Sequence, residues 1–540
     1  MSPAFLRPAT TGVLLRELDA RLGSLRPGSV SPDADVRVTG VTLDSRGVRP
    51  GDLYAALPGF HAHGADFATG AVASGAVAVL TDPDGVGRLG AGALGVPVLV
   101  VDRPRDVLGG LSGLVYGDPA AALTMVGITG TNGKTTTAYL IDSALRAHAH
   151  RTGLVGTVET RIGDVRVDSV RTTPEAPDLH AILAVMRERG VDTCVMEVSS
   201  HALDLHRVDG VVYDVALFTN LSQDHLDFHP TMEDYYAAKA SLFTPEHSRA
   251  GVVCVDDEWG VRLAGEATVP VTTMSTTHPD ADWVVELGEG GAFTLREGAG
   301  ARELRLTSHL PGTFNVANAA LAALALLATG LDAAAVERAM AVAPAVPGRM
   351  ETVSDGGTGP RCIVDFAHTP VAVDAALRAL RPSTTGRLVV VLGAGGDRDR
   401  GKRPGMGAAA ARNADVVVVT DDNPRSEDPA TIRAAVISGA RAELERSGST
   451  QVRVVDGGSR AAAIAEAVAL AVLDQEQRRA DAESRGDALS SDVDTVVVLG
   501  KGHEKGQEVA GVIHPFDDRD AVRAALAAAH PSGTTAEVSS

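Results

Sequence analysis

The feature that most constrains the fold of this 540-residue chain is a glycine-rich stretch, GITGTNGKTTT, at residues 127–137. The apolar run LTMV leads into it, and its last residues open the segment KTTTAYLIDSALRA. That segment carries an apolar stripe at helical spacing, formed by Leu140, Ile141, Ala144 and Leu145. A strand, a glycine-rich turn and a helix in this order predict a βαβ unit, with the turn at the carboxyl end of a parallel strand.

The turn has the composition of a phosphate-binding loop, although the strict Gly-x4-Gly-Lys-Ser/Thr pattern fails because Ile128 occupies the first glycine position. Gly130 and Gly133 let backbone N–H groups converge on an anion at a helix N-terminus. Lys134 adds positive charge, and Thr135 can reach a Mg²⁺ ion. An ordinary glycine-rich turn is the alternative, but the consecutive Gly-Lys-Thr-Thr-Thr favours a nucleotide site.

Three series of elements follow one another along the chain. The first consists of short β-branched or apolar runs at 36–43, 52–57, 76–81 and 97–101. The second alternates strands such as TCVMEV and GVVCV with helical patterns, and residues 282–307 predict an inserted hairpin or meander. The third contains the buried strands CIVDFA, RLVVVLGA, DVVVVTDD and TVVVLGKG.

These series predict an α/β protein with three domains. We expect a small N-terminal α/β domain over 1–118, a central parallel-sheet P-loop ATPase domain over 119–350 and a C-terminal Rossmann-like domain over 351–540. The charged segment 474–493 is expected to form a solvated loop or a helix extension, and GTTAEVSS at the C-terminus a loose tail.

Charge and composition narrow the class of protein. A formal net charge of −20 argues against a general binder of nucleic acids or acidic membranes. The N-terminus lacks a signal-peptide pattern, and no run of about 18 apolar residues predicts a membrane span. We expect the three scattered cysteines, Cys194, Cys254 and Cys362, to be reduced and buried, as in a cytosolic protein. We therefore expect a cytoplasmic protein that binds neither nucleic acid nor membrane.

The chain resembles the Mur ligase family on seven motifs that stand in the family's order: GTNGKTTT, MEVSSHALDLHR, TNLSQDHLDFH, GRME, DFAHTP, DNPRSEDP and GKGHE. The likeness runs from LDSR at 43–46 to about residue 530. It implies a ligase in which a D-glutamate γ-carboxylate attacks the γ-phosphate of ATP, giving an acyl phosphate and ADP. An incoming amine then displaces the phosphate. Since carboxylate and triphosphate carry like charges, metal ions and cations matter more here than a protein nucleophile.

The resemblance also implies which residues carry the chemistry. The catalytic positions are Lys134, Glu197, His225 and Lys239, and two Mg²⁺ ions are expected at Thr135, Glu197, His225 and Lys239. For Glu197, at the end of the strand TCVMEV, the alternative is a carboxylate that caps the strand end. Zinc is disfavoured because no HExxH or Cys/His spacing joins the histidines His201, His206, His225 and His229. We expect His229 to be structural.

Lys239 stands out from the residue pattern itself. Thr231 and Asp234 form a capping-box start, so TMEDYYAAKASLF is predicted to be a helix. Lys239 then lies in a stripe with Tyr235, Tyr236, Leu242 and Phe243, where an ammonium is costly unless it is paired or neutralised. A lysine that reaches out to water is the alternative. The resemblance implies carbamylation by CO₂, which needs a desolvated, neutral amine and yields a carboxylate-like Mg²⁺ ligand.

For ATP, the positions that match the family are Gly130, Thr131, Asn132, Gly133, Lys134, Thr135, Thr136, Asn315, Arg349 and His368. The alternative role for Asn315 and Asn318, at the head of GTFNVANAALAALALL, is helix capping. Arg349 in GRME, together with Asp365 and His368 in DFAHTP, stands at the second domain junction. In the family these residues meet ATP when the C-terminal domain closes, and closure excludes water from the acyl phosphate.

For the nucleotide-sugar peptide, the matching positions are Leu43, Ser45, Thr172, Thr173, Ser199 and Arg207. Two neighbouring residues depart from the pattern of some family members. Leu205 stands where an amide is often found, and Arg171 stands where asparagine is common.

For the incoming amino acid, the matching positions are Arg398, Asp422, Asn423, Pro424, Arg425, Gly500 and Glu504. DNPR is the pattern of diaminopimelate-adding members, and lysine-adding members lack its arginine. Diaminopimelate has a distal carboxylate that Arg425 can grip bidentately, and the Glu504 carboxylate suits an ammonium. The alternative for Arg425 is a loop salt bridge with Glu427 or Asp428. GAGGDRDRGKRP also resembles a dinucleotide fingerprint, but Arg398 fills its third glycine position.

The resemblance therefore implies a monomeric enzyme of peptidoglycan precursor synthesis that acts on small molecules. It would add diaminopimelate to UDP-N-acetylmuramoyl-L-alanyl-D-glutamate at the expense of ATP. Three alternatives stay open: a lysine-adding ligase, a folylpolyglutamate-type ligase and a non-catalytic nucleotide-binding regulator. Arg425 speaks against the first and the LDSR segment against the second. Against the third stands the joint presence of Lys134, Glu197, His225 and Lys239.

Overall fold

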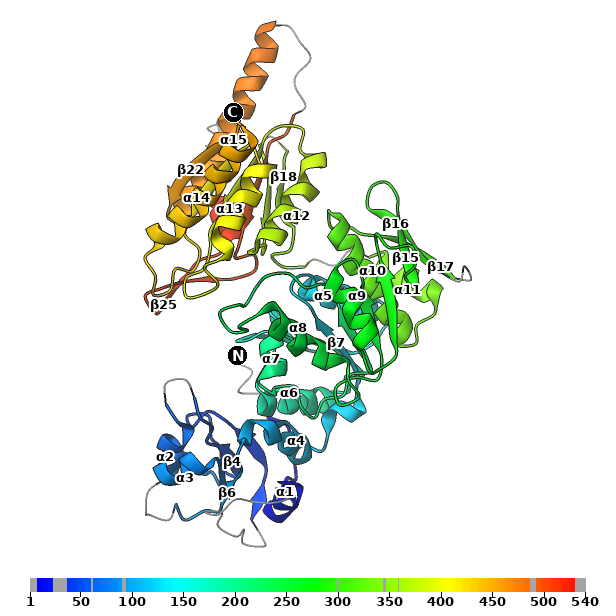
Figure 1. The fold of residues 1–540 in the computed structure, drawn as a ribbon, viewed down its shortest axis with the longest axis vertical. Coiled ribbons are helices and arrows are strands. Elements are labelled where there is room, and N and C mark those ends of the chain that lie inside the picture. The colour runs from blue at the N-terminus through cyan, green and yellow to red at the C-terminus, as the bar shows by residue number, and fades with distance from the viewer. Residues whose placement is uncertain are drawn as a thin grey trace, which may run out of the picture.

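The computed structural model describes residues 7–22, 36–59, 62–89, 94–298, 300, 302–342, 346–357, 359–485 and 492–529. Three units follow one another along the long axis of the molecule, with the N-terminal unit at one end and the C-terminal unit at the other (Figure 1). Each unit is built around its own sheet of mainly parallel core strands. The α/β fold predicted from the strand patterns is therefore confirmed.

The N-terminal unit has a four-stranded parallel sheet whose strands fall within the four predicted runs: β3 (Gly40–Thr42), β4 (Asp52–Ala55), β5 (Ala78–Thr81) and β6 (Val98–Val100). Its other strands and α-helices are β1 (Val13–Leu14), α1 (Leu15–Leu22), β2 (Arg37–Val38), α2 (Ala68–Ala73), α3 (Pro83–Arg88) and α4 (Pro104–Tyr116). Leu108 and Leu111 of α4 share a core with Ala181 and Ala184 of α6 (Ala176–Glu188), which belongs to the middle unit. This apolar contact holds the N-terminal unit against the middle unit.

The middle unit contains an eleven-stranded sheet in the order β10-β9-β8-β11-β7-β12-β13-β14-β15-β16-β17. Its parallel strands are β8 (Thr152–Val155), β11 (Thr193–Glu197), β7 (Thr124–Thr129), β12 (Val215–Phe218), β13 (Gly251–Cys254), β14 (Val271–Ser275) and β15 (Trp283–Leu287). Antiparallel pairings add β9 (Glu159–Ile162), β10 (Val165–Asp168), β16 (Ala292–Glu297) and β17 (Glu303–Thr307). The run from β15 to β17 confirms the predicted meander.

Helices enclose this sheet on both faces. One face is covered by α5 (Lys134–Ala147), α10 (Thr313–Ala328) and α11 (Ala333–Met340). The other face is covered by α6, α8 (Met232–Ala240) and α9 (Glu258–Glu266), and α7 (Ser200–Asp204) follows β11. Because both faces are buried, the central strands are almost wholly apolar, as their sequences suggested.

The C-terminal unit has a six-stranded sheet in the order β18-β19-β23-β20-β21-β22. These strands are β18 (Glu351–Asp355), β19 (Arg361–Asp365), β20 (Leu388–Leu392), β21 (Val416–Thr420), β22 (Arg453–Gly458) and β23 (Thr495–Leu499). On one face lie α12 (Pro370–Leu380), α13 (Lys402–Asn413) and α14 (Pro429–Ser447). On the other lie α15 (Arg460–Arg485) and α16 (Asp518–Ala529). A hairpin of β24 (Gly506–Val509) and β25 (Val512–Pro515) completes the unit.

The charged segment predicted as a loop or helix extension continues α15 as far as Arg485, and this part of the helix projects from the C-terminal unit (Figure 1). Residues 486–491 of that segment and the predicted tail at 533–540 lie outside the described residues. The three cysteines are buried and unpaired, as expected. In the ranges that the structure describes, none of the helices combines the length and apolarity needed to cross a membrane.

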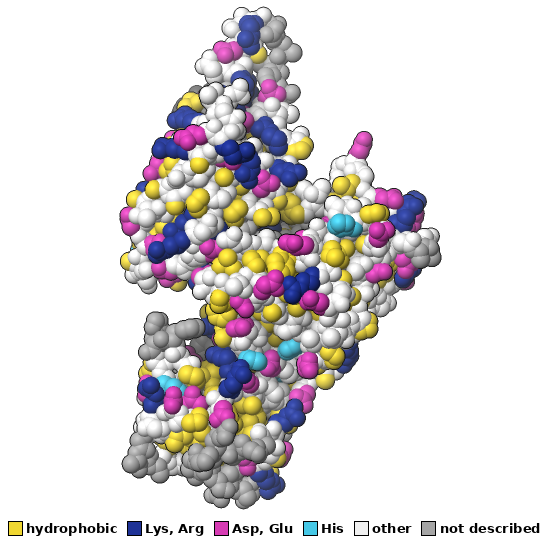
Figure 2. Space-filling view, viewed as in Figure 1, with side chains coloured by type: hydrophobic (Ala, Val, Ile, Leu, Met, Phe, Trp, Pro, Cys, Tyr) yellow, Lys and Arg dark blue, Asp and Glu magenta, His cyan; other side chains and the backbone are white. Residues whose placement is uncertain are grey.

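The middle and C-terminal units face each other across a cleft of about 1320 Å³. Residues from both units line it, among them Leu287, Leu310, Phe314, Val346 and Ile363. Figure 2 shows apolar side chains gathered where these two units meet. The candidate site described next lies at the same junction, because the two cavities share Phe314, Arg349 and Met350 in their linings.

Candidate active site

The glycine loop joins β7 to α5 at the carboxyl end of a central strand. Ile128 still belongs to β7 and is fully buried, so the strand continues past the position where the strict pattern asks for its first glycine. Gly130 and Gly133 have φ values of 139° and 91°. A Cβ on Gly130 would lie 1.9 Å from Thr219 Oγ1, and one on Gly133 would lie 2.3 Å from Asn318 Oδ1. Both positions therefore require glycine.

Two lysines converge on this loop. Lys134, the first residue of α5, donates from Nζ to the carbonyl oxygens of Gly130 and Thr131 at 2.8 and 2.9 Å. Lys239, near the end of α8, donates from Nζ to the same Gly130 oxygen at 2.8 Å. Its side chain is 1% exposed, so the alternative that it reaches water is wrong, and the predicted capping box of Thr231 and Asp234 is present. Burial, then the Lys134 charge, lowers the pKa of Lys239 well below its ordinary value.

Glu197 lies at the carboxyl end of β11, beside β7, and is buried. Its Oε2 accepts from the hydroxyls of Thr135 and Thr157 at 2.9 and 3.0 Å, and its Oε1 accepts from the Thr157 backbone N–H at 2.8 Å. The carboxylate thus joins the first turn of α5 to the 156–158 segment after β8. Such a buried carboxylate and hydroxyl at one end of a parallel sheet is an oxygen-rich environment that suits a Mg²⁺ ion.

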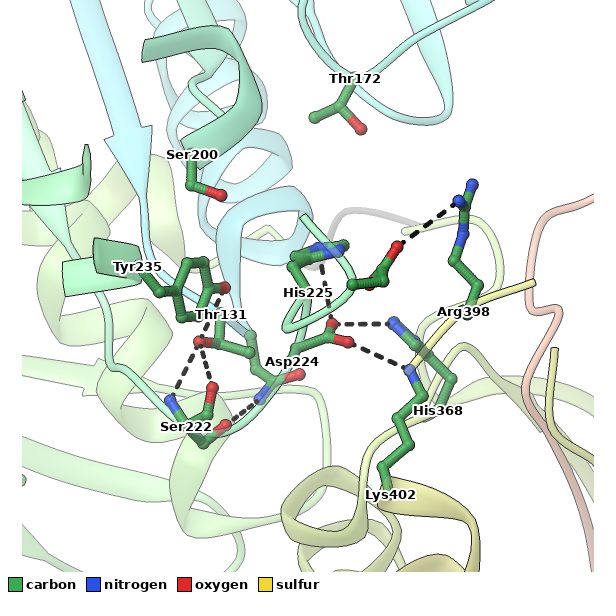
Figure 3. Close-up of polar contacts among 12 residues, drawn as sticks. Thr131, Thr172, Ser200, Ser222, Asp224, His225, Tyr235, His368, Arg398 and Lys402 are labelled. Atoms are coloured by element: carbon green, nitrogen blue, oxygen red, sulfur yellow. Dashed lines mark hydrogen bonds and ion pairs between the residues drawn. The ribbon is translucent and has the colours of Figure 1, made fainter. Parts of the chain in front are cut away.

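A second centre forms around Asp224 (Figure 3). One of its oxygens lies 3.1 Å from Nζ of Lys402, and the other lies 3.4 Å from Nε2 of His368 and 3.6 Å from Nε2 of His225. Burial alone would raise the pKa of Asp224, but the hydrogen bond from His368 and the charge of Lys402 hold it well below its usual range. Asp224 therefore links the middle unit to two segments of the C-terminal unit.

His225 borders the same space. Burial lowers its pKa to about 3, with Asp224 opposing and His201 and Lys239 adding to the shift. The imidazole is therefore neutral at physiological pH, which is the form that binds metal ions. His229, by contrast, is buried with Nε2 2.9 Å from Ser200 Oγ, in agreement with the structural role expected for it.

The head of α10 and the segment after α11 border the glycine loop. Asn315 donates to the Pro311 carbonyl at 2.8 Å and accepts from Asn318 at 3.1 Å. The N-cap of α10 is Gly312, so capping by these asparagines is wrong. Arg349 donates from Nη2 to Thr135 Oγ1 at 3.0 Å and lies over the Phe366 ring at 4.3 Å. Arg349, in the segment that joins the middle and C-terminal units, thus contacts Thr135 directly after the glycine loop.

These groups line one cavity of about 560 Å³ between the loop and the C-terminal unit. Its lining includes eleven residues predicted for ATP or metal binding: Thr131, Asn132, Gly133, Lys134, Thr135, Thr136, Glu197, His225, Asn315, Arg349 and His368. Thr172 and Ser199 also line it, so the predicted nucleotide and substrate positions meet in one space. Lys239 lies behind the loop, bonded to Gly130.

The residues predicted for the nucleotide-sugar peptide divide between two units. Leu43 and Ser45 follow β3 in the N-terminal unit. In the middle unit, Thr173 donates to the Glu197 carbonyl at 2.9 Å, and Thr172 Oγ1 lies 3.0 Å from Thr157 Oγ1. Ser199 caps α7. Arg207 lies 3.0 Å from Glu175, a carboxylate that also pairs with Arg105 and with Arg171, one of the two departures from the family pattern.

The predicted amino-acid positions follow three neighbouring parallel strands of the C-terminal sheet. Arg398 lies after β20, Asp422–Arg425 after β21, and Gly500 and Glu504 after β23. Asn423 donates to Glu504 Oε2 at 2.9 Å, and the fully buried Lys501 donates to both Asn423 Oδ1 and Glu504 Oε2. Arg398 lies across the gap, 3.8 Å from Asp227 of the middle unit (Figure 3). The strand ends thus bring all three segments together.

Arg425 differs from its alternative prediction. Its ion pair is with Glu508 of β24, at 3.2 Å, and not with Glu427 or Asp428. Glu427 instead pairs with Arg403, at 2.8 Å, and Asp428 caps α14. Glu508 could not be predicted as its partner because β24 lies about 80 residues further along the chain.

Sequence reasoning missed several other residues of the site: Thr157, Glu175, Asp224, Lys402 and Lys501. Three of them stand inside motifs that drew attention for other reasons, Asp224 in SQDHLDFH, Lys402 in GDRDRGKRP and Lys501 in GKGHE. A buried charged residue needs a partner of opposite charge. An acid in one motif and a lysine in another motif of the same site could therefore have been predicted to pair. Thr157 had no such signal, because it binds Glu197 partly through its backbone.

Comparison with known proteins agrees with the geometry. Residues 37–116 match the Mur ligase family catalytic domain, residues 128–326 the Mur ligase middle domain, and residues 348–475 the Mur ligase glutamate ligase domain. A Streptomyces avermitilis protein named UDP-N-acetylmuramoyl-L-alanyl-D-glutamate--2,6-diaminopimelate ligase is 54% identical over 506 residues, 92% of this chain and 94% of the relative. A Corynebacterium glutamicum protein of the same name is 48% identical over 497 residues, 91% of this chain and 92% of the relative.

A solved structure described as a UDP-N-acetylmuramoyl-L-alanyl-D-glutamate--2,6-diaminopimelate ligase has the same fold, with a TM-score of 0.62 at 31% identity. The match covers 96% of this chain and 100% of that chain. The resemblance read from seven short motifs thus extends through all three units. On these matches, the chain belongs to the Mur ligase family.

Proposed function

We propose that this protein is an ATP-dependent ligase that joins diaminopimelate to the D-glutamate γ-carboxylate of UDP-N-acetylmuramoyl-L-alanyl-D-glutamate. The observation that carries the proposal is the single cavity of about 560 Å³ in which the glycine loop, Glu197, His225 and the hinge residue Arg349 meet. The substrates are inferred from the relatives that are named as diaminopimelate ligases. We assign three domains, to residues 1–118, 119–350 and 351–540. The nucleotide-sugar peptide would bind mainly to the first, ATP to the second and the amino acid to the third.

For ATP, the N-terminus of α5 and the N–H groups of the glycine loop bind the phosphates, and Lys134 leaves its loop carbonyls to pair with them. Asn315 lines the same cavity and would bind near the adenine. Arg349 and His368 reach the nucleotide from the C-terminal side. Arg349 donates to Thr135 Oγ1. Closure of the C-terminal unit and binding of the ATP phosphates would therefore both affect the Thr135 hydroxyl.

The residues present fit Mg²⁺. In the described part of the chain, no group of three His, Cys, Asp or Glu side chains is arranged to hold a metal ion alone. Mg²⁺ does not need such a group, since it takes one or two protein carboxylates together with water and substrate phosphates. Thr135, Glu197, His225 and a carbamate on Lys239 would hold two ions. The ions would supply the positive charge that lets a carboxylate approach a triphosphate.

The carbamate follows from the state of Lys239. Its amine has a strongly lowered pKa because it is buried beside another lysine. A neutral amine attacks CO₂, forms an N–C bond and releases one proton, which leaves a carboxylate-like group with one negative charge. That negative charge would attract the Lys134 amine in its charged form, which lies at the same Gly130 oxygen.

For the substrates, the nucleotide-sugar peptide would lie along Leu43, Ser45, Thr172, Thr173, Ser199 and Arg207. Diaminopimelate would lie among Arg398, Arg425, Gly500, Glu504 and the loop Asp422–Pro424, with its distal carboxylate on Arg425 and its distal ammonium on Glu504. The enzyme is proposed to work as a cytoplasmic monomer, as the family likeness suggests.

A lysine-adding enzyme is the second candidate. Arg425 disfavours it, since a guanidinium beside a pocket for lysine would repel the substrate's side-chain ammonium. The N-terminal domain that matches the Mur ligase family between residues 37 and 116 disfavours a folylpolyglutamate-type ligase.

The test is ADP formation by the purified full chain with Mg²⁺, ATP and the UDP-linked dipeptide, while the amino acid is varied. We expect ADP release with diaminopimelate and a product whose mass equals the two substrates joined with loss of water. Lysine, glutamate and no amino acid are the controls. ADP release with lysine alone, or none with any amino acid, would contradict the proposal.

A further inference from the structure

The hairpin of β24 and β25 is attached to the loop that carries Arg425. Four hydrogen bonds join them: Gln507 Nε2 to Asp422 O at 2.6 Å, Glu508 N to Asn423 Oδ1 at 2.9 Å, Arg425 N to Glu508 O at 3.0 Å, and Ala510 N to Arg425 O at 2.7 Å. The outer strand, β25, is exposed along its whole length. Because a two-stranded hairpin is marginally stable alone, these bonds determine where it lies.

The backbone of Arg425 has an unusual conformation that these bonds explain. Its φ is +52°, in the left-handed region, which residues other than glycine rarely adopt. Its N–H and its carbonyl are both bonded to β24 and the turn that follows it. The hairpin therefore holds the residue in a conformation that it would not otherwise favour.

The guanidinium of Arg425 is held on two sides. Nη1 donates to the Gly396 carbonyl at 2.7 Å, and Nε lies 3.2 Å from Glu508 Oε2. In the part of the chain that the structure describes, no hydrogen bond involves Nη2. A free arginine side chain samples many rotamers, and fixing one of them costs conformational entropy. Here the protein fixes them before any substrate binds.

We propose that Glu508 is a positioning residue for substrate selection, which holds the guanidinium of Arg425 so that its Nη2 side meets the distal carboxylate of the incoming amino acid. The inference rests on the proposed function, because it requires an amino acid with a distal carboxylate. Glu508 pairs with the Nε side of the guanidinium and Gly396 accepts from Nη1, which leaves Nη2 to meet the incoming carboxylate. Its side chain is 38% exposed, so its charge is screened and its main contribution is orientation.

The test compares two substitutions. Glu508→Ala removes the contact, whereas Glu508→Gln removes the charge but keeps an oxygen that can accept from Nε. The measurements are kcat and KM for diaminopimelate at saturating ATP and UDP-linked dipeptide, and KM for ATP. We expect Glu508→Ala to raise the KM for diaminopimelate about three- to tenfold, in line with the loss of one partly exposed charge-assisted contact. Glu508→Gln should stay within about twofold of wild type, with kcat and KM for ATP unchanged in both.

Ile513→Thr is the matched control, because Ile513 is the cross-strand partner of Glu508 in the same hairpin, is 72% exposed and has no charged group that could hold Arg425. It should leave all constants near wild type. An unchanged KM in Glu508→Ala overturns the inference, and so does a lower KM in both variants, which would make Glu508 a competitor of the substrate. Equal losses in kcat and in KM for ATP would show general support of the fold and would also overturn it. If the wild type does not use diaminopimelate, the proposed function itself fails, which is a separate result.

Discussion

The side-chain amines of Lys134 and Lys239 both donate to the carbonyl oxygen of Gly130, each at 2.8 Å. Two ammonium groups on one oxygen repel each other, and little water is present to screen them. Burial and Lys134 lower the pKa of Lys239 well below its ordinary value, so Lys239 is the amine that gives up its proton. Burial also lowers the pKa of Lys134, so the glycine loop brings together two buried amines, of which Lys239 has its pKa lowered well below the ordinary value.

We predict that Lys239→Ala loses at least about a hundredfold in kcat, because the carboxylate-like Mg²⁺ ligand is lost. Short carboxylates such as formate or acetate should restore part of the activity by taking the place of the carbamate. The measurement is ADP formation with and without these anions, and Lys239→Met serves as a control for lost packing. If the anions restore nothing, or if a Mg²⁺- and nucleotide-bound structure shows a bare ammonium at this position, the carbamate assignment is wrong.

Lys134→Ala should abolish ligation while leaving the fold intact. Removing a charge that stabilises a phosphoryl transition state costs about 3–4 kcal/mol, or two to three orders of magnitude in rate. Thermal unfolding should change by only a few degrees, because Lys134 makes hydrogen bonds within its own loop. A folded Lys134→Ala protein with near-normal turnover would show that the loop does not bind the phosphates of ATP.

Asp224 and Lys402 form a buried ion pair between the middle and C-terminal units, 3.1 Å apart. Leaving one charge of such a pair unpartnered costs about 3–5 kcal/mol when it stays buried. Since the units can separate instead, we expect Lys402→Met to lower kcat/KM ten- to a hundredfold, about 1.4–2.8 kcal/mol. Binding of ATP should change much less, because the phosphate loop lies wholly in the middle unit.

Asp399→Asn is the control for this pair, because Asp399 joins the same two units through an exposed hydrogen bond to Gln223. It should change kcat/KM less than about twofold. Equal effects of the two substitutions would mean that the buried pair has no special part in bringing the units together.

Acid should destabilise the protein partly through His180. This histidine is fully buried in α6, and burial lowers its pKa, so it stays neutral in the folded state. The unfolded chain takes up a proton near pH 6.5, and stability is therefore lost as the pH falls below that value. His180→Gln, whose amide can still donate to the Asp209 carbonyl, should show a smaller fall in Tm between pH 7.5 and 5.5. An unchanged pH dependence would contradict this assignment.

The order of strands and helices could be predicted from the sequence because its signals are local. Buried parallel strands such as β20, β21 and β23 are continuous apolar runs, and the capping box of α8 lies within four residues. Lys239 could be placed in a buried stripe for the same reason. The phosphate loop was recognised although its pattern fails, because the strand, the glycines and the helix are contiguous.

The contacts that complete the site could not be predicted, because they join segments far apart in the chain. Asp224 meets Lys402 only after the middle and C-terminal units pack together, and Arg425 meets Glu508 only after β24 folds back on its loop. The predicted partners of Arg425 were its near neighbours in sequence, and the left-handed backbone of the residue turns its side chain elsewhere. Such pairings depend on topology and not on local pattern.

The central claim is that this enzyme adds diaminopimelate and that Arg425 selects it over lysine. Losing a charge-assisted bidentate contact in a closed site costs about 2–5 kcal/mol, so Arg425→Ala should lower kcat/KM for diaminopimelate roughly 30-fold or more. Lysine need not become a good substrate, since Glu504 and the shape of the pocket remain. The decisive measurement is kcat/KM for both amino acids in wild type and Arg425→Ala, with ATP saturating. We expect a wild-type preference for diaminopimelate that collapses in the variant, whereas equal losses for both amino acids would contradict the claim.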